Sequence, residues 1–87
     1  MFVVLCYDVG IKRNAKAKRL ARKFLRPVQE SVCEGFITDR RLNSLLRQFA
    51  LLIDPAEDSV VIYKFKSDDS AEKTCIGQAK RNEDFIL

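Results

Sequence analysis

Residues 2–10 read Phe2-Val3-Val4-Leu5-Cys6-Tyr7-Asp8-Val9-Gly10, and this stretch decides the fold. The unbroken apolar run from Phe2 to Tyr7 is typical of a central strand that is covered on at least one face. Gly10 permits a turn into the element that follows. Asp8 interrupts the apolar pattern. Because a buried, unpaired carboxylate is costly, we expect Asp8 to have a partner or a metal ion.

The next segment concentrates positive charge. From Lys12 to Arg26 there are eight basic residues and no acidic one, whereas the rest of the chain holds the other eight basic residues and all 12 acidic ones. Apolar residues recur at helical spacing from Ala17 to Leu25, which predicts an amphipathic helix that Pro27 ends. Its opposite face is predicted to carry Lys12, Lys16, Arg19, Arg22, Lys23 and Arg26.

This basic face favours a polyanionic partner. A solvated helix face usually mixes charges of both signs, and like charges repel one another, so contact with nucleic-acid phosphates is the preferred interpretation over simple solvation. A membrane surface is a weaker alternative, because the apolar stripe is needed to cover a sheet. Arg13 departs from the pattern, since it points toward the apolar side at the start of the helix.

The remaining patterns predict a second helix and further strands. An apolar stripe at helical spacing lies between a Thr38-Asp39 cap and an Asp54-Pro55 stop. Extended segments are predicted at residues 28–37, 59–66 and 74–77. Residues 28–37 form either one bent strand or two short paired strands, and Gly35 marks a bulge or bend.

This order of elements indicates an α+β sandwich. Each helix has a single apolar stripe, so both should cover the same face of the sheet. The other face, with residues such as Val4, Val61 and Tyr63, would lack a cover. A second copy of the chain would supply one, and the apolar residues Phe85-Ile86-Leu87 would add a strand to a neighbour's sheet. We therefore expect a homodimer, since 87 residues provide little core of their own.

Composition excludes several classes of protein. The chain is 47% hydrophobic and 32% charged, which is typical of one folded domain. It has no His, so Ser-His-Asp and Cys-His nucleophile systems and histidine metal sites are excluded. Cys6, Cys33 and Cys75 are far apart, which argues against a disulfide framework or a zinc site and fits a reducing cytosol. No apolar run approaches the ~18 residues of a membrane span, so we expect no membrane partner.

Asp8 has two interpretations. It is either a local cap for the first helix or a ligand for a hard cation such as Mg²⁺, which accepts few protein ligands when phosphates and waters complete its shell. A two-fold axis beside Asp8 would bring in a second copy of it, and the metal would then activate water for phosphodiester hydrolysis. Tyr7 and Ser31 are polar neighbours that are candidates for catalysis, with a structural role as the alternative for each.

These residues carry a family resemblance. Tyr7-Asp8-Val9 at the end of an apolar strand, followed by a basic helix, resembles the start of the CRISPR-associated protein 2 family. Residues 28–35 resemble its V-Q-x-S-V-F-E-G pattern, and residues 58–63 its D-S-V-x-I-Y strand. Ile76-Gly77 and the apolar residues 85–87 also fit. Cys33 stands where the family usually has an aromatic residue, which puts any role of that ring in doubt.

The resemblance implies a ferredoxin-like fold over residues 1–87, with residues 78–87 as a dimerisation segment that joins the partner's sheet. It implies that Asp8 from both subunits holds Mg²⁺, or Mn²⁺, and that the protein serves spacer acquisition in antiviral defence in a prokaryotic cytoplasm. Some members of the family are described as metal-dependent nucleases of RNA or duplex DNA. Others are architectural and bridge dimers of a larger CRISPR-associated integrase.

Two functional hypotheses follow from these observations. The first is a metal-dependent endonuclease with Asp8, Tyr7 and Ser31 as catalytic candidates. The second is a non-catalytic scaffold that binds DNA and the integrase. Both use a nucleic-acid surface made of Lys12, Arg13, Lys16, Arg19, Arg22, Lys23 and Arg26. A small RNA-binding or toxin-like module outside CRISPR systems is a third possibility.

Overall fold

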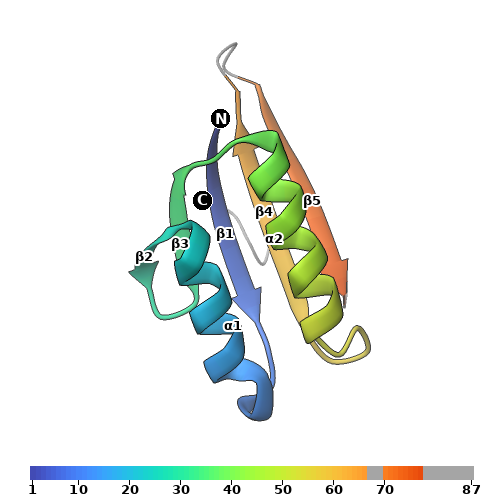
Figure 1. The fold of residues 1–87 in the computed structure, drawn as a ribbon. Helices are drawn as coiled ribbons and strands as arrows, with labels where there is room; N and C mark the ends of the chain where they lie inside the picture. Colours follow the sequence, from blue (N-terminus) through green and yellow to red (C-terminus); the bar gives the residue numbers. More distant parts are fainter. Residues whose placement is uncertain (67–69, 78–87) are drawn as a thin grey trace.

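The computed structural model describes residues 1–66 and 70–77 as one antiparallel sheet with two helices on one of its faces (Figure 1). The sheet order is β2-β3-β1-β4-β5. The elements are β1 (Phe2–Asp8), α1 (Ile11–Phe24), β2 (Arg26–Gln29), β3 (Val32–Phe36), α2 (Asp39–Leu52), β4 (Ser59–Phe65) and β5 (Ala71–Gly77). This arrangement confirms the α+β, ferredoxin-like class.

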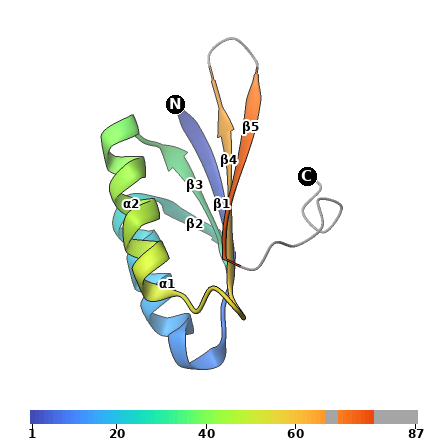
Figure 2. The ribbon, with the colours of Figure 1, turned by 90° about the vertical axis from the view of Figure 1, so that its right-hand side faces the viewer.

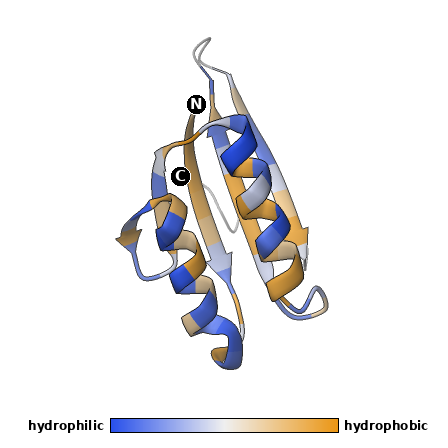
Figure 3. Cartoon of the chain, in the orientation of Figure 1, coloured by the Kyte–Doolittle hydropathy of each residue, from blue (hydrophilic) through white to orange (hydrophobic). Residues whose placement is uncertain are grey.

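Strand β1 is the central strand that its apolar run predicts. It pairs with β3 on one side and with β4 on the other. Val3, Leu5 and Tyr7 point toward the helices and are buried, whereas the alternate residues point to the opposite face. Both helices lie on the same side of the sheet (Figure 2). The hydrophobic colour along β1 gives way to a hydrophilic end at its carboxyl terminus (Figure 3).

The basic helix is shorter than its charge run. It ends at Phe24, with Leu25 as an extended C-cap, and Arg26 begins strand β2. The expectation that Arg26 belongs to the helix face is therefore wrong. The residue before a proline is pushed out of the helical region by the proline ring, so Pro27 forces Arg26 into an extended conformation.

The segment after α1 is a pair of short strands. β2 and β3 are antiparallel and joined by a turn at residues 30–31, which resolves the choice between one bent strand and two paired ones. The register shift lies between Pro27 and Gln29 and not at Gly35, which pairs regularly with Val3. Helix α2 has the expected cap, since the Thr38 side chain accepts a hydrogen bond from the backbone N–H of Arg41 at 3.2 Å.

The face of the sheet away from the helices carries the apolar residues that the sequence places there. Val4 and Tyr63 are half-buried, but Val61 is buried, contrary to its expected exposure. Val61 lies between Cys6 on β1 and Cys75 on β5, in the middle of the sheet. The predicted dimerisation segment, residues 78–87, lies outside the described residues. In the part of the chain that the structure describes, no helix is long and apolar enough to cross a membrane.

Candidate functional site

Asp8 is the last residue of β1, and its side chain is exposed. The cost of burying a carboxylate therefore does not apply to Asp8, because the strand ends here and the residue is exposed to solvent. Alternation along β1 places Asp8 on the face away from the helices. Its cross-strand partner is Ser59, the first residue of β4.

Asp8 does not cap the first helix. The N-cap of α1 is Gly10, and no side chain bonds to it in the manner of a cap. Instead, the backbone N–H of Gly10 donates to Oδ1 of Asp58 at 2.9 Å, across 48 residues of sequence. The capping interpretation of Asp8 is therefore wrong.

Asp58 holds the turn that follows Asp8. It is fully buried and accepts four hydrogen bonds, two on each carboxylate oxygen. Its donors are the backbone N–H groups of Gly10 and Asp54 and two guanidinium nitrogens of Arg13. The hydrogen bond from Arg13 is the largest cause that lowers the pKa of Asp58 from 3.8 to about 2. The β1–α1 turn is thereby joined to the loop between α2 and β4.

Arg13 therefore does not belong to the basic face. Its guanidinium is committed to Asp58, and only 25% of its side chain is exposed. This contact explains why Arg13 departs from the amphipathic pattern of the helix. That departure was the one signal in the sequence that a buried acidic partner existed, but nothing in the local pattern identified Asp58 as that partner.

Ser59 is the second residue that sequence reasoning missed. It is 1% exposed, and its Oγ is a buried polar atom with no hydrogen-bond partner. Among the described residues, it is the only buried side-chain nitrogen or oxygen in that condition. It is paired directly with Asp8, so an orphaned hydroxyl and an exposed carboxylate share one end of the open face.

The other two catalytic candidates occupy different places. Tyr7 points into the helix-side core, where its ring lies 5.9 Å from that of Phe49 and its hydroxyl donates to the carbonyl of Glu30 at 3.2 Å. Burial raises the pKa of the Tyr7 phenol. The structure thus places Tyr7 and Asp8 on opposite faces of the sheet. Ser31 lies in the β2–β3 turn, and its carbonyl accepts a hydrogen bond from the backbone of Tyr7 at 3.1 Å.

The candidate nucleic-acid residues divide into separate groups. Lys12 is exposed at the start of α1, and three further cations line the groove between α1 and α2, beside Leu20, Gln48 and Leu52. These three are Lys16, Arg19 and Lys23. On the other side of α1, Lys18 is paired with Glu30 at 2.8 Å. The hydrogen bond from Lys18 lowers the pKa of Glu30, and the charge of Arg22 lowers it further.

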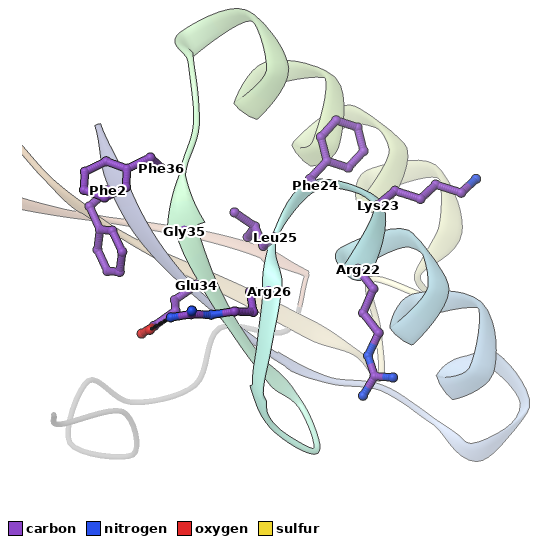
Figure 4. A pocket seen from close by; sticks show the side chains of 9 residues that line it. All are labelled: Phe2, Arg22, Lys23, Phe24, Leu25, Arg26, Glu34, Gly35 and Phe36. Atoms are coloured by element: carbon purple, nitrogen blue, oxygen red, sulfur yellow. Dashed lines mark hydrogen bonds and ion pairs between the residues drawn. The ribbon is translucent and has the colours of Figure 1, made fainter.

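Arg26 lies apart from both groups. It is paired with Glu34 across the β2–β3 ladder at 3.2 Å. Arg22, Lys23 and Arg26 all line one open pocket at the end of α1, but their side chains extend in different directions (Figure 4). Of the predicted set, Lys16, Arg19 and Lys23 thus line the α1–α2 groove together, and the others lie elsewhere.

The donors at Asp8 match a hard cation only in part. A carboxylate oxygen is a ligand that Mg²⁺ accepts, whereas the hydroxyl of Ser59, the residue paired with Asp8, is buried. The described residues of one chain contain no group of three or more His, Cys, Asp or Glu side chains that could hold a metal. One chain thus offers half of such a site.

Comparison with known proteins identifies the family of the chain. Residues 1–73 match the family model described as CRISPR associated protein Cas2. The chain belongs to the Cas2 family. A relative from Dictyoglomus turgidum named CRISPR-associated endoribonuclease Cas2 is 36% identical, and one of the same name from Thermotoga maritima is 38% identical. Both alignments cover 100% of each chain.

Solved structures share the fold. A crystal structure of Cas2 from Streptococcus pyogenes has a TM-score of 0.70 and 26% identity, covering 78% of this chain and 89% of that one. A hypothetical protein from Thermus thermophilus also has a TM-score of 0.70, with 28% identity over 76% of this chain and 82% of that one. The resemblance seen in the sequence is thus confirmed.

Proposed function

We propose that this member of the Cas2 family is a metal-dependent endonuclease that hydrolyses phosphodiester bonds in RNA or duplex DNA during CRISPR adaptation. The observation that carries the proposal is the exposed carboxylate of Asp8 at the end of the central strand, on the sheet face away from the helices. Relatives of this chain carry the name CRISPR-associated endoribonuclease Cas2, which supports phosphodiester hydrolysis as the reaction.

The proposed site is shared between two copies of the chain. Because one chain offers a single carboxylate there, Asp8 from each subunit of a homodimer would hold the Mg²⁺ or Mn²⁺ ion. When bound, the ion supplies an activated water and neutralises charge on the phosphate. Two other parts of the chain would assist this site. Asp58 holds the turn that follows Asp8, and the cations of the α1–α2 groove would attract the nucleic-acid backbone.

Substitution of Asp8 tests the catalytic proposal. Cleavage of single-stranded RNA and of duplex DNA is measured with Mg²⁺, Mn²⁺ or EDTA, after light scattering has established the oligomeric state. Asp8→Asn is expected to abolish metal-dependent cleavage while nucleic-acid binding persists. Asp39→Asn, the same chemical change at an exposed position in α2, is the matched control and should cleave like the wild type. Equal cleavage by wild type and Asp8→Asn would refute the proposal.

A scaffold function is the second candidate, and the α1–α2 groove favours it. Lys16, Arg19 and Lys23 present charge along one groove without an acidic residue in its lining. Such a surface fits the phosphates of a duplex, which a dimer would hold for the larger CRISPR-associated integrase. This function needs the basic groove and the dimer, but it does not need Asp8.

The salt dependence of duplex binding tests the groove. Each neutralised phosphate contributes about 0.9 to the slope of log K against log salt concentration, so Arg19→Gln with Lys23→Gln should reduce the slope by about 2. The control variant, Lys64→Gln with Lys66→Gln, removes the same charge from β4 and its end, where Glu72 pairs with both lysines. A slope that is equal in the two variants would exclude the groove as the binding surface.

A further inference from the structure

We propose that an aromatic row at the start of β1, made of Phe36, Phe2 and Phe65, is a stacking subsite for an unpaired base of a nucleic-acid strand. This inference deepens the proposed function, on which it rests for the class of ligand. Phe2 is paired with Phe36 on β3 and with Phe65 on β4. Because directly opposed residues of neighbouring strands point to the same side of a sheet, the three rings share the face away from the helices.

The rings of the aromatic row touch one another and still leave Phe36 in water. The ring centroids of Phe2 and Phe36 are 5.1 Å apart in an edge-to-face contact, and those of Phe2 and Phe65 are 6.5 Å apart. Phe36 is 83% exposed and Phe65 is 38% exposed, whereas Phe2 between them is half-buried. Contiguous exposed apolar side chains mark binding surfaces. Phe2 thus supports the Phe36 ring, and most of that ring stays open to a ligand.

Cations beside the aromatic row indicate which ligand fits it. Phe2 and Phe36 line one open pocket together with three basic residues, Arg22, Lys23 and Arg26 (Figure 4). Among the described residues that line this pocket, the one carboxylate is that of Glu34, which is paired with Arg26 at 3.2 Å. Positive charge therefore remains in excess there. Proteins that bind single strands combine aromatic rings, on which bases stack, with cations that hold the phosphates.

A second copy of the chain is the competing occupant of the aromatic row. Phe2 and Asp8 are the two ends of β1, which has 7 residues, so they lie about 20 Å apart at about 3.3 Å per residue. A dimer that joins the two Asp8 residues is therefore centred at the other end of the face. Two copies that met through the aromatic row would also bring their basic residues together, and like charges repel. A polyanionic strand complements the same charges.

Fluorescence tests whether a base reaches Phe36. The chain has no tryptophan, so Phe36→Trp introduces a single indole that reports on stacking. Single-stranded oligothymidine is titrated into the intact protein in EDTA, which prevents metal-dependent cleavage. The strand should quench the indole fluorescence, and a duplex of the same length should quench it far less, because its bases stay paired. Quenching by the two ligands to the same depth at saturation would overturn the stacking subsite.

Affinity tests whether the aromatic ring itself is needed. From the loss that alanine substitution of a stacking ring typically causes, Phe36→Ala should raise the Kd for oligothymidine about tenfold. Phe36→Leu, which stays apolar without a π-system, should lose nearly as much, and Phe36→Tyr should keep the wild-type Kd. Leu51→Ala is the matched control, because Leu51 is also 83% exposed but lies on α2, and it should leave the Kd unchanged. Equal Kd values for wild type and Phe36→Ala overturn the inference.

Light scattering at one protein concentration distinguishes the competing occupant. Phe36→Ala should keep the oligomeric state of the wild type. A variant that dissociates yet binds oligothymidine like the wild type would assign the aromatic row to a second copy and overturn the inference. The nuclease proposal fails by a different result, which is cleavage that does not depend on Asp8. The stacking measurements are made without metal and are therefore decided separately from it.

Discussion

Replacing Asp58 with Asn should destabilise the protein although it removes no atom from the core. The carboxylate receives two donors on each oxygen: Gly10 N–H and Arg13 Nη2 on Oδ1, and Asp54 N–H and Arg13 Nε on Oδ2. The amide of asparagine keeps one acceptor oxygen and has an NH₂ donor in place of the second carboxylate oxygen. Asp58→Asn therefore leaves two of the four donors facing another donor, inside a fully buried position.

The magnitude follows from these contacts. A hydrogen bond to a charged group contributes about 1.5–3 kcal/mol, so two of them are worth up to about 6 kcal/mol. Arg13 keeps a quarter of its side chain in water, and solvent recovers part of the loss. We expect a net decrease of about 2–4 kcal/mol in the free energy of unfolding. For a domain of this size that lowers the Tm by at least about 10 °C.

Urea unfolding of both proteins at one fixed protomer concentration measures this loss, because self-association makes stability depend on concentration. Glu57→Gln is the control: Glu57 is 4.0 Å from Arg13 Nη2 and 71% exposed, so it should change stability by less than about 0.5 kcal/mol. A loss for Asp58→Asn that is also below about 0.5 kcal/mol would refute the reasoning.

The pH dependence gives the same prediction a second test. The folded-state pKa of Asp58 is lowered, from 3.8 to about 2. Its ionised form therefore contributes stability that is complete above the unfolded pKa and is lost as the pH falls through the folded one. The difference in stability between wild type and Asp58→Asn should be constant at neutral pH and shrink between about pH 4 and pH 2. A difference that stays constant down to pH 2 would exclude the ionised carboxylate as its source.

Three further substitutions test the backbone and the core. Gly77→Ala should cost more than about 2 kcal/mol of unfolding free energy, since it combines a positive φ with a Cβ placed 2.3 Å from a backbone oxygen of Asp58. Gly10→Ala should cost less in the same thermal melt, because Gly10 has a φ of −62° and its Cβ would meet side-chain atoms of Arg13 and Asp58 and no backbone atom. Tyr7→Phe should lose about 0.5–1.5 kcal/mol with its bond to the Glu30 carbonyl and should retain cleavage. A folded Tyr7→Phe protein that no longer cleaves would make the phenol catalytic.

The layers of the fold could be predicted because their signals are local. The apolar run of β1 and the stripe of α2 between its Thr38 cap and its proline stop follow the periods of strand and helix. The end of α1 was misjudged because the charge run continues to Arg26 past the last helical residue. In that segment the steric effect of Pro27 outweighs the pattern of charge.

Of the candidate site, the sequence singles out only Asp8, and its role in the site stays a prediction. Its exposure, the burial of Ser59 and the contact between Arg13 and Asp58 all depend on pairings between distant residues; the last of these joins positions 45 residues apart. Periodicity contains no information about such pairings. For the same reason, Tyr7 and Asp8 appear as neighbours in the sequence but leave the strand on opposite faces.

The consecutive residues Asp58 and Ser59 both lie next to the segment that carries Asp8. Asp58 directs its carboxylate to the helix side, where it holds Gly10 and Arg13 and so fixes the turn after β1. Ser59 begins β4 and, by the alternation of the strand, lies on the opposite face beside Asp8. One dipeptide thus constrains the segment that carries the proposed metal ligand: the Asp58 carboxylate bonds to the turn after Asp8, and Ser59 pairs with Asp8 across the two strands.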